Sequence, residues 1–129
     1  MVLVLIDADK DPPCILGPEL LASAREVDVR ADVSCVLANI EYETWFVAAA
    51  KSLHELLKLP PDTQIPEDPE TRRLGKAWIN DHFRGTKYSE TIDQPRMTAL
   101  MDLSRCRARS PSFDKLCREL EKRIGPTDV

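Results

Sequence analysis

The sequence predicts an α/β domain with a small parallel sheet in its first half and a mostly helical second half. Two short apolar segments rich in β-branched residues, 2–6 and 33–38, are typical of buried strands. A helical segment follows each of them, and strand-helix-strand-helix is the pattern of a parallel unit with a right-handed crossover. With 129 residues, the chain is expected to form a single domain over 1–129.

The helices of the first half, residues 1–59, are predicted from apolar spacing. Gly17-Pro18 is expected to open a helix over 18–27, because the prolines within 9–18 disfavour a regular element there. Residues 40–59 are expected to form the strongest helix of the chain, since their apolar side chains recur at helical spacing. These side chains are Trp45, Phe46, Ala49, Leu53, Leu56 and Leu57.

A proline-rich loop, 60–69, is predicted to separate the acidic first half from a helical, basic half, 70–129. Asp68-Pro69 predicts the cap and first turn of a helix that carries Leu74, Ala77, Trp78 and Phe83. Residues 84–95 are expected to be irregular, and Pro95 to begin a helix through about Cys106. For the last helix, Ser110 is the predicted cap, Pro111 the first residue and Gly125-Pro126 the end. Its inward-facing residues are predicted to be Phe113, Leu116, Cys117, Leu120 and Ile124.

Composition narrows the class of protein. A hydrophobic content of 43% with 31% charged residues is typical of a soluble globular chain. The apolar run 2–6 is too short to span a bilayer and no basic leader precedes it, so we expect a cytoplasmic protein with no membrane association. The four cysteines form no C-x-x-C pair and neither histidine lies at ligand spacing from them. We therefore expect reduced, mostly buried thiols rather than zinc ligands.

The net charge of −4 is the sum of two opposite halves: residues 1–70 carry −9 and residues 71–129 carry +5. One interpretation places a cation site beside a phosphate-attracting surface. The other is a pair of solvated faces that attract each other weakly.

Carboxylates follow both predicted strands. Asp7, Asp9 and Asp11 come after the first strand, in "LIDADKD" (5–11), and Glu41 and Glu43 come after the second. Parallel strands joined by a crossover end at the same edge of the sheet, so the five carboxylates are expected to converge on one rim. Asp7 and Asp9, two apart in an extended segment, would point the same way and share a cation. Oxygen ligands favour Mg²⁺ or Mn²⁺ over zinc.

Simpler roles for these acids also fit. Aspartates after a strand often cap a turn, and Glu41 and Glu43 can complement the positive end of their helix or be solvated. An EF-hand loop starting at Asp7 is excluded, because Pro12 and Pro18 stand where it needs Gly and Glu. A haloacid-dehalogenase phosphatase would need a small β-branched residue in place of Asp11. With four glycines and no Gly-rich run, the chain offers no nucleotide-binding loop for a glycosyltransferase.

The basic half offers candidates for contact with phosphate. Lys76 is expected on a helix, Lys87 and Tyr88 fall in the irregular segment, and three arginines alternate near a helix end. The arginines are Arg105, Arg107 and Arg109. The alternative is that Lys76 is solvated and that the arginines complement the C-terminal end of their helix.

Four motifs together resemble the bacterial TOPRIM-like proteins, a family related to topoisomerase, primase and overcoming-lysogenization-defect nuclease domains. In order they are "VLVLIDADKD", "VLANIEYETWFVAAAKSL", "KYSETIDQP" and "RSPSFDKLCREL", and they extend over nearly the whole chain. The resemblance implies that Asp7 and Asp9 bind Mg²⁺ for phosphoryl transfer and that Glu41 and Glu43 are the glutamate pair before the family's Trp-Phe. It also implies nucleic acid as substrate and an ATPase as protein partner, in a defence or mobile-element system. Other recurrent family positions, without a known role, are Lys76, Tyr88, Asp93, Gln94, Ser112 and Phe113.

TOPRIM-like proteins normally begin with a further strand that ends in a glutamate. Here Met1 leads directly into the aspartate-bearing strand. We therefore expect either a shortened chain or a degenerate domain, and self-association through the open apolar edge of the first strand. The leading hypothesis is a metal site at Asp7 and Asp9, completed by Glu41 or Glu43, with Lys76 offsetting phosphate charge. The alternative is a non-catalytic interaction module that binds an ATPase and keeps the acids as a relic.

Overall fold

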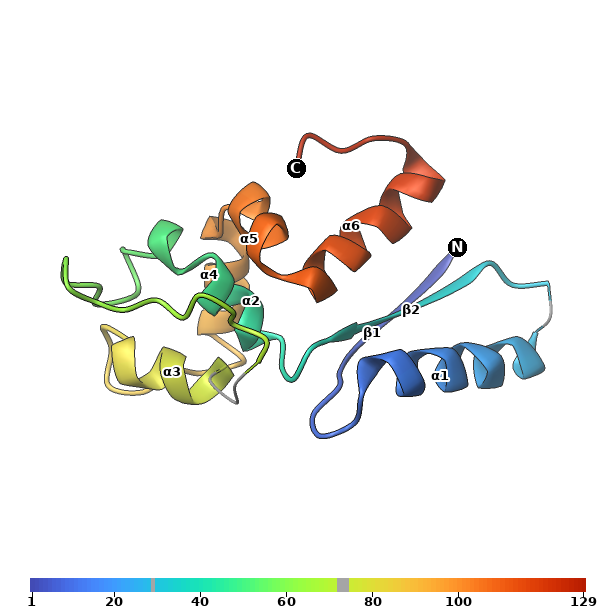
Figure 1. Cartoon of the computed structure of the whole chain (residues 1–129), viewed down its shortest axis with the longest axis horizontal. Helices are drawn as coiled ribbons and strands as arrows, with labels where there is room; N and C mark the ends of the chain where they lie inside the picture. Colours follow the sequence, from blue (N-terminus) through green and yellow to red (C-terminus); the bar gives the residue numbers. More distant parts are fainter. Residues whose placement is uncertain (29, 72–74) are drawn as a thin grey trace.

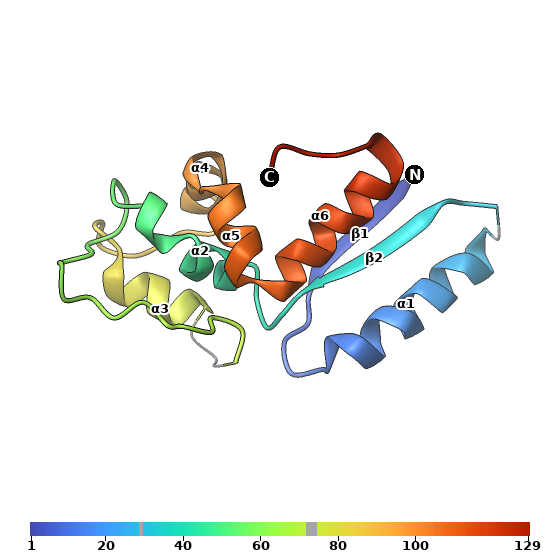
Figure 2. The same cartoon turned by 45° about the horizontal axis from the view of Figure 1, so that its top comes forward.

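A two-stranded parallel sheet organises one end of the molecule. The computed structural model describes residues 1–28, 30–71 and 75–129. Strands β1 (Val2–Asp7) and β2 (Val33–Ala38) pair in register from Val2 opposite Val33 to Asp7 opposite Ala38. Helix α1 (Pro13–Val27) forms the crossover, and α1 and α6 (Pro111–Ile124) lie on opposite sides of β2 (Figure 1; Figure 2). The predicted strands and their parallel arrangement are confirmed. Only β2 is buried as predicted, since the residues of β1 are exposed or half-buried.

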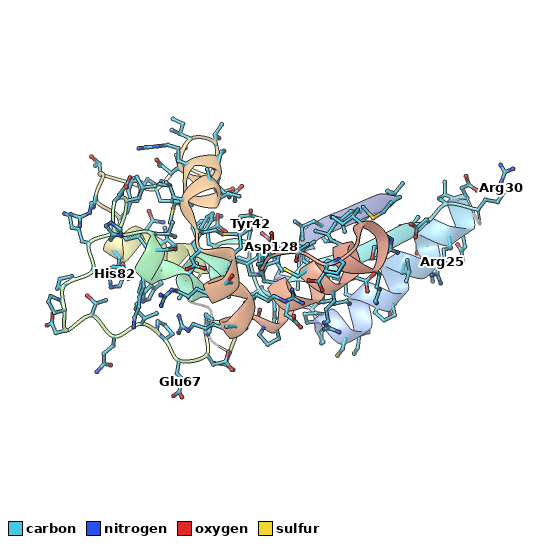
Figure 3. The ribbon with its side chains drawn as sticks, turned by 90° about the horizontal axis from the view of Figure 1, so that it is seen from above. Arg25, Arg30, Tyr42, Glu67, His82 and Asp128 are labelled. Carbon is cyan, nitrogen blue, oxygen red and sulfur yellow. The ribbon has the colours of Figure 1, made fainter. Side chains whose placement is uncertain are left out.

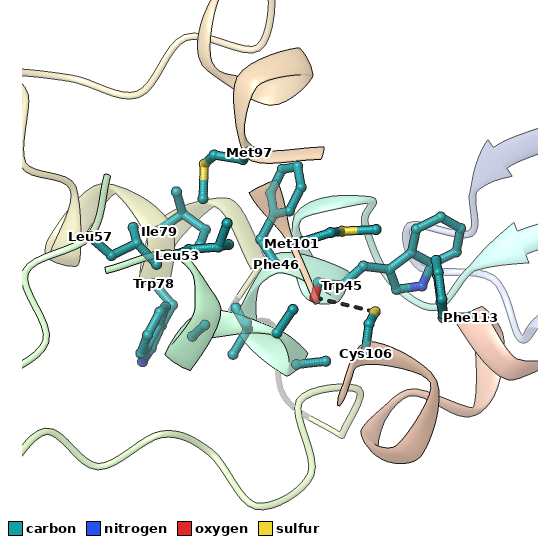
Figure 4. Packing of buried hydrophobic residues seen from close by; sticks show 14 of the residues in the cluster. Trp45, Phe46, Leu53, Leu57, Trp78, Ile79, Met97, Met101, Cys106 and Phe113 are labelled. Carbon is teal, nitrogen blue, oxygen red and sulfur yellow. Dashed lines mark hydrogen bonds between the residues drawn. The ribbon is translucent and has the colours of Figure 1, made fainter. Parts of the chain in front are cut away.

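The remaining helices gather beyond one end of the sheet (Figure 1). They are α2 (Glu43–Ala48), the short 3₁₀ helix η1 (Ala50–Ser52), α3 (Gly75–His82), α4 (Asp93–Leu100) and α5 (Leu103–Arg109). We call this group the helical lobe. Helix α2 is at its centre: residues 43–50 are all buried, and Figure 4 shows Trp45 and Phe46 packed among side chains from α3, α4, α5 and α6. Each large apolar side chain buried in this way stabilises the fold by about 1.5–3 kcal/mol. The chain is thus an α/β domain with a mostly helical second half.

The predicted helix over 40–59 is wrong in its length. Regular α-helix ends at Ala48, η1 follows, and Leu57 then forms an antiparallel bridge with Phe83. Two backbone hydrogen bonds flank the bridge, from Lys58 N–H to His82 and from Arg84 N–H to Leu56. The apolar residues of this segment are buried on several sides at once, so their spacing does not define a single helical face.

Helix α1 begins at Pro13, five residues before the predicted start. Pro12 is extended and Pro13 occupies the first helical turn, where the missing N–H is not needed. Pro18 lies inside the helix and removes the hydrogen bond to Cys14, but both residues are exposed, so water can reach the free carbonyl. The prolines of this segment start a helix rather than prevent one.

The second half differs from prediction in several places. The helix expected from Pro95 to Cys106 is two helices, because Met101 is extended and the Asp102 side chain caps α5 by accepting from Arg105 N–H. Residues 69–71 form turns rather than a helical turn, and Leu74 lies outside the described residues. Ala77 and Trp78 lie on α3 as predicted, whereas Phe83 follows the end of α3 at His82 and forms the bridge with Leu57.

The last helix follows the prediction at both ends. Ser110 Oγ accepts a hydrogen bond from Phe113 N–H, Pro111 is the first helical residue, and Gly125 ends the helix with a φ of 90°. The inward face was predicted one turn too long, since Ile124 is 69% exposed. Within the described residues, no helix has the length and apolarity needed to cross a membrane. The four cysteines are unpaired, and all except Cys14 are buried.

Candidate functional site

The two strands continue to pair beyond their ends, and this places the acidic segments side by side. Ala8 N–H donates to Ala38 and Asp9 N–H donates to Ile40, at 3.0 and 2.9 Å. Asp9 and Ile40 both have positive φ, 52° and 62°. For a β-branched residue this conformation is an outlier, and such strained residues cluster at functional sites. The expectation that Asp9 continues the strand is wrong: β1 ends at Asp7, and the backbone of Asp9 is left-handed.

We call the carboxylates of Asp7, Asp9, Asp11, Glu41 and Glu43 the acidic rim. Asp7 lies at its centre, where its Oδ1 accepts a 2.8 Å hydrogen bond from Tyr42 N–H in the loop after β2. Partial desolvation raises the pKa of Asp7 and the Tyr42 N–H opposes that rise, while the charges of Glu43, Asp9 and Glu41 add to it. The predicted convergence of carboxylates from the two strand ends is therefore present for Asp7, Asp9, Glu41 and Glu43.

Two adjoining hollows open along the acidic rim. One is lined by Asp9, Lys10, Asp11, Ile40 and Glu41. The other is lined by Leu5, Ile6, Asp7, Asp9, Tyr42 and Gln94. Asp9 borders both hollows and therefore sits between Asp7 and the exposed Asp11. Among the residues that the structure describes, no group of three or more Asp, Glu, His or Cys side chains is placed to hold one metal ion.

Glu41 caps a helix of the helical lobe. Its Oε2 accepts a 2.8 Å hydrogen bond from Lys76 N–H in the first turn of α3. Gly75 makes the contact possible, because a Cβ atom there would lie 2.5 Å from the same oxygen. A carboxylate at a helix N-terminus is stabilising. Glu41 thus complements α3, whereas the sequence-based alternative assigned it to the helix that follows it directly.

Glu43 is buried, with 2% of its surface exposed. Its Oε1 accepts hydrogen bonds from the Tyr88 hydroxyl at 2.8 Å and from Gln94 Nε2 at 3.1 Å. Burial, and secondarily the Glu43 carboxylate, raises the pKa of Tyr88, so the phenol stays protonated and donates. The alternative of a solvated Glu43 is therefore wrong. Tyr88 and Gln94 are site residues whose contacts the sequence did not predict, although both lie in the polar motif "KYSETIDQP".

Lys76 approaches the acidic rim but is paired with another carboxylate. Its Nζ forms an ion pair with Glu90, and its side chain remains 42% exposed. The hydrogen bond to Glu90 is the main cause that raises the pKa of Lys76, and the charges of Glu43 and Glu41 contribute. The structure thus places the predicted basic residue next to the predicted carboxylates, together with a partner that the sequence did not predict.

A buried polar network holds the loop after β2 from the other side. Ser112 Oγ accepts from Trp45 Nε1 at 2.8 Å and from Asn39 N–H at 3.2 Å, and it donates to Glu70 at 2.7 Å. Glu70 also accepts from Ser110 and from Ser112 N–H. Because every donor reaches an acceptor, this network fixes the end of β2 against the start of α6.

One comparison with known proteins gives a match. A family model described as a domain of unknown function (DUF4276) matches residues 1–121. No curated protein matches the sequence, and no solved structure matches it.

Proposed function

The chain belongs to the DUF4276 family, and we propose that it is a TOPRIM-like domain whose acidic rim binds Mg²⁺ or Mn²⁺ for phosphodiester chemistry on nucleic acid. The observation that carries the proposal is the crowding of Asp7 with Asp9, Glu41 and Glu43 at the ends of two parallel strands. Desolvation is the main cause that raises the pKa of Asp7, and the charges of these three carboxylates add to it. Like charges held together in this way are stabilised by a bound cation.

The donor atoms suit a hard divalent cation. The acidic rim offers carboxylate oxygens, and the hollow shared by Asp7 and Asp9 is open to solvent. Mg²⁺ usually keeps several waters and needs only one or two carboxylates, so a site built on Asp7 and Asp9 does not require a third protein ligand. Asp11 borders the adjoining hollow, on the far side of Asp9. A metal held there would supply Lewis-acid activation of a phosphodiester.

The chain's own residues would then act in three ways. Asp7 and Asp9 hold the cation. Glu43, held by Tyr88 and Gln94, presents a carboxylate near them whose charge would favour cation binding. Lys76, at the N-terminus of α3 and partly exposed, offsets the charge of a phosphate group when it leaves Glu90.

A second candidate function is a non-catalytic interaction module that binds an ATPase. The observation that favours it is that three predicted catalytic side chains already have partners within the chain. Glu41 caps α3, Glu43 accepts from Tyr88, and Lys76 pairs with Glu90. In that case these residues stabilise the fold, and the aspartates of β1 have no catalytic role.

The deciding experiment is calorimetric titration of the folded chain with Mn²⁺. We compare the wild type with Asp7→Asn/Asp9→Asn and with Glu26→Gln/Asp28→Asn, which removes two exposed carboxylates at the far end of α1. Binding in the wild type and the control, lost in the rim variant, supports the metal site, and Mn²⁺-dependent cleavage of DNA or RNA that Asp9→Asn abolishes would establish the activity. A folded wild type that binds no Mn²⁺ would overturn the proposal. Co-purification with an ATPase that Asp9→Asn leaves unchanged would then support the interaction module.

A further inference from the structure

A small basic hollow lies in the helical lobe and shares no lining residue with the hollows of the acidic rim. Its volume is about 260 Å³, and it is lined by Lys51, Thr63, Ile65, Arg105 and Arg109. No acidic side chain lines it. Three cations therefore surround a space large enough for a phosphate group, in a chain whose net charge is −4.

Arg109 is the fixed member of this group. It donates from Nη1 to the Ala48 carbonyl at 2.8 Å and from Nη2 to the Pro66 carbonyl, so it ties α5 to α2 and to the proline-rich loop. Both partners are neutral carbonyls, which orient the guanidinium without neutralising its charge.

Of the other two cations, Lys51 has no ion-pair partner among the described residues and Arg105 has only a long, exposed one. Arg105 is 3.8 Å from Asp102, too far for a hydrogen bond, and both side chains are nearly half exposed. Ion pairs between such exposed side chains contribute little to the stability of the fold.

Helix geometry explains why the three arginines of α5 have different surroundings. Arg105 and Arg109 are four residues apart and share one face of α5. Arg107 lies on another face, where its Nε donates to Asp114 at 2.9 Å and its guanidinium also pairs with Glu121. The Arg107 charge is therefore neutralised by α6, whereas the charges of Arg105 and Arg109 face the basic hollow.

We propose that the basic hollow binds a phosphate group, held by Lys51, Arg105 and Arg109. Like charges gathered around an open space repel, and an anion relieves that repulsion. Arginine presents planar donors that match phosphate oxygens, and the Thr63 hydroxyl can donate as well. The phosphate comes either from a nucleic-acid backbone or from a free phosphorylated compound. Phosphate binding here does not depend on the metal site.

The test compares two charge-matched double variants. Lys51→Ala/Arg105→Ala removes two cations from the basic hollow and leaves Arg109 to support the fold. Arg25→Ala/Arg30→Ala removes two cations at the opposite end of the molecule (Figure 3). Thermal unfolding is measured with inorganic phosphate and with chloride at equal ionic strength. We expect phosphate to raise the Tm of the wild type and of the Arg25/Arg30 variant, but not that of the Lys51/Arg105 variant. Asp7→Asn/Asp9→Asn should keep the phosphate effect, which separates this proposal from the metal site.

A labelled single-stranded oligonucleotide then distinguishes the two sources of phosphate. If the source is nucleic acid, the Lys51/Arg105 variant weakens binding and reduces the slope of log K against log salt by about 0.7, the value for one single-strand phosphate contact. If the wild type responds to inorganic phosphate but does not bind the oligonucleotide, the source is a free phosphorylated compound. No phosphate effect on the wild type, or an effect that persists in the Lys51/Arg105 variant, would overturn the proposal.

Discussion

The carboxylate of Asp7 accepts a 2.8 Å hydrogen bond from the backbone N–H of Tyr42. This contact ties the end of β1 to the loop that follows β2, at the point where carboxylates from both segments meet. One neutral donor thus holds a carboxylate whose other neighbours include three negative charges, those of Glu43, Asp9 and Glu41. The mutual repulsion of these charges reduces the stability of the fold.

Asp7→Asn should therefore stabilise the metal-free protein at neutral pH. Asparagine keeps the Oδ1 acceptor for Tyr42 N–H and removes the charge. Since the pKa of Asp7 is raised above 3.8 in the folded state, its ionisation opposes folding, and its contribution to stability falls as pH rises through the folded pKa. We expect a gain on the order of 0.5 kcal/mol at pH 7 after solvent screening, shrinking toward pH 4.

Urea unfolding of the two proteins between pH 4 and pH 7 measures this difference. Asp11→Asn serves as the control, because it removes the same charge from the adjoining hollow and not from the centre of the acidic rim. A difference between wild type and Asp7→Asn that does not vary with pH would contradict the account.

Glu41 and Gly75 should be energetically coupled. A Cβ at position 75 displaces Glu41 Oε2 and removes its hydrogen bond to Lys76 N–H, a cap of about 1 kcal/mol. Gly75→Ala also favours the helical state by reducing backbone entropy in the unfolded chain. We expect Gly75→Ala to cost about 1 kcal/mol more in the wild type than in the Glu41→Ala background. A double-mutant cycle by urea unfolding gives the coupling, and purely additive effects would count against the cap.

The open edge of β1 predicts self-association of the isolated chain. No strand pairs with that edge among the described residues, and Val2 and Ile6 are 51% and 40% exposed. Lysine on an edge strand disfavours pairing with a second edge. We expect concentration-dependent sedimentation of the wild type, suppressed in Val2→Lys with its circular dichroism unchanged. A clean monomer at high concentration would refute the prediction.

The sequence predicted the sheet and the last helix well, because short-range signals decide them. The β-branched segments 2–6 and 33–38 became β1 and β2, and Ser110, Pro111 and Gly125 delimit α6 as expected. The prediction of one helix over 40–59 was wrong because long-range contacts decide the course of this segment. Its course after Ala48 depends on the bridge between Leu57 and Phe83, a long-range contact that apolar spacing does not encode.

The same distinction applies to the candidate site. Topology alone predicted that carboxylates after two parallel strands would meet, and they do. The partners of those carboxylates were not predictable, since Glu41 accepts from a backbone N–H 35 positions later and Glu43 accepts from a hydroxyl 45 positions later. The left-handed conformation of Ile40 was equally hidden, because the residue type disfavours it and it occurs where Ile40 accepts a long-range hydrogen bond from Asp9 N–H.

Removing the hydrogen bond from Tyr88 to Glu43 should lower the free energy of unfolding by more than removing a hydrogen bond between two neutral groups does. Tyr88→Phe leaves a buried carboxylate with one donor fewer, and hydrogen bonds to charged groups are worth about 1.5–3 kcal/mol. Tyr42→Phe is the matched control, because its hydroxyl bonds the neutral Thr98 at 3.1 Å and should cost about 0.5–1.5 kcal/mol.

Glu43→Gln removes the charge of the Glu43 side chain and keeps an oxygen that accepts from the Tyr88 hydroxyl. In this background, urea unfolding should show that Tyr88→Phe lowers the free energy of unfolding by no more than Tyr42→Phe does in the wild type. Equal losses for Tyr88→Phe in both backgrounds would mean that Glu43 is protonated in the folded protein. It would then supply no negative charge to the acidic rim, and its proposed contribution to cation binding at Asp7 and Asp9 would be lost.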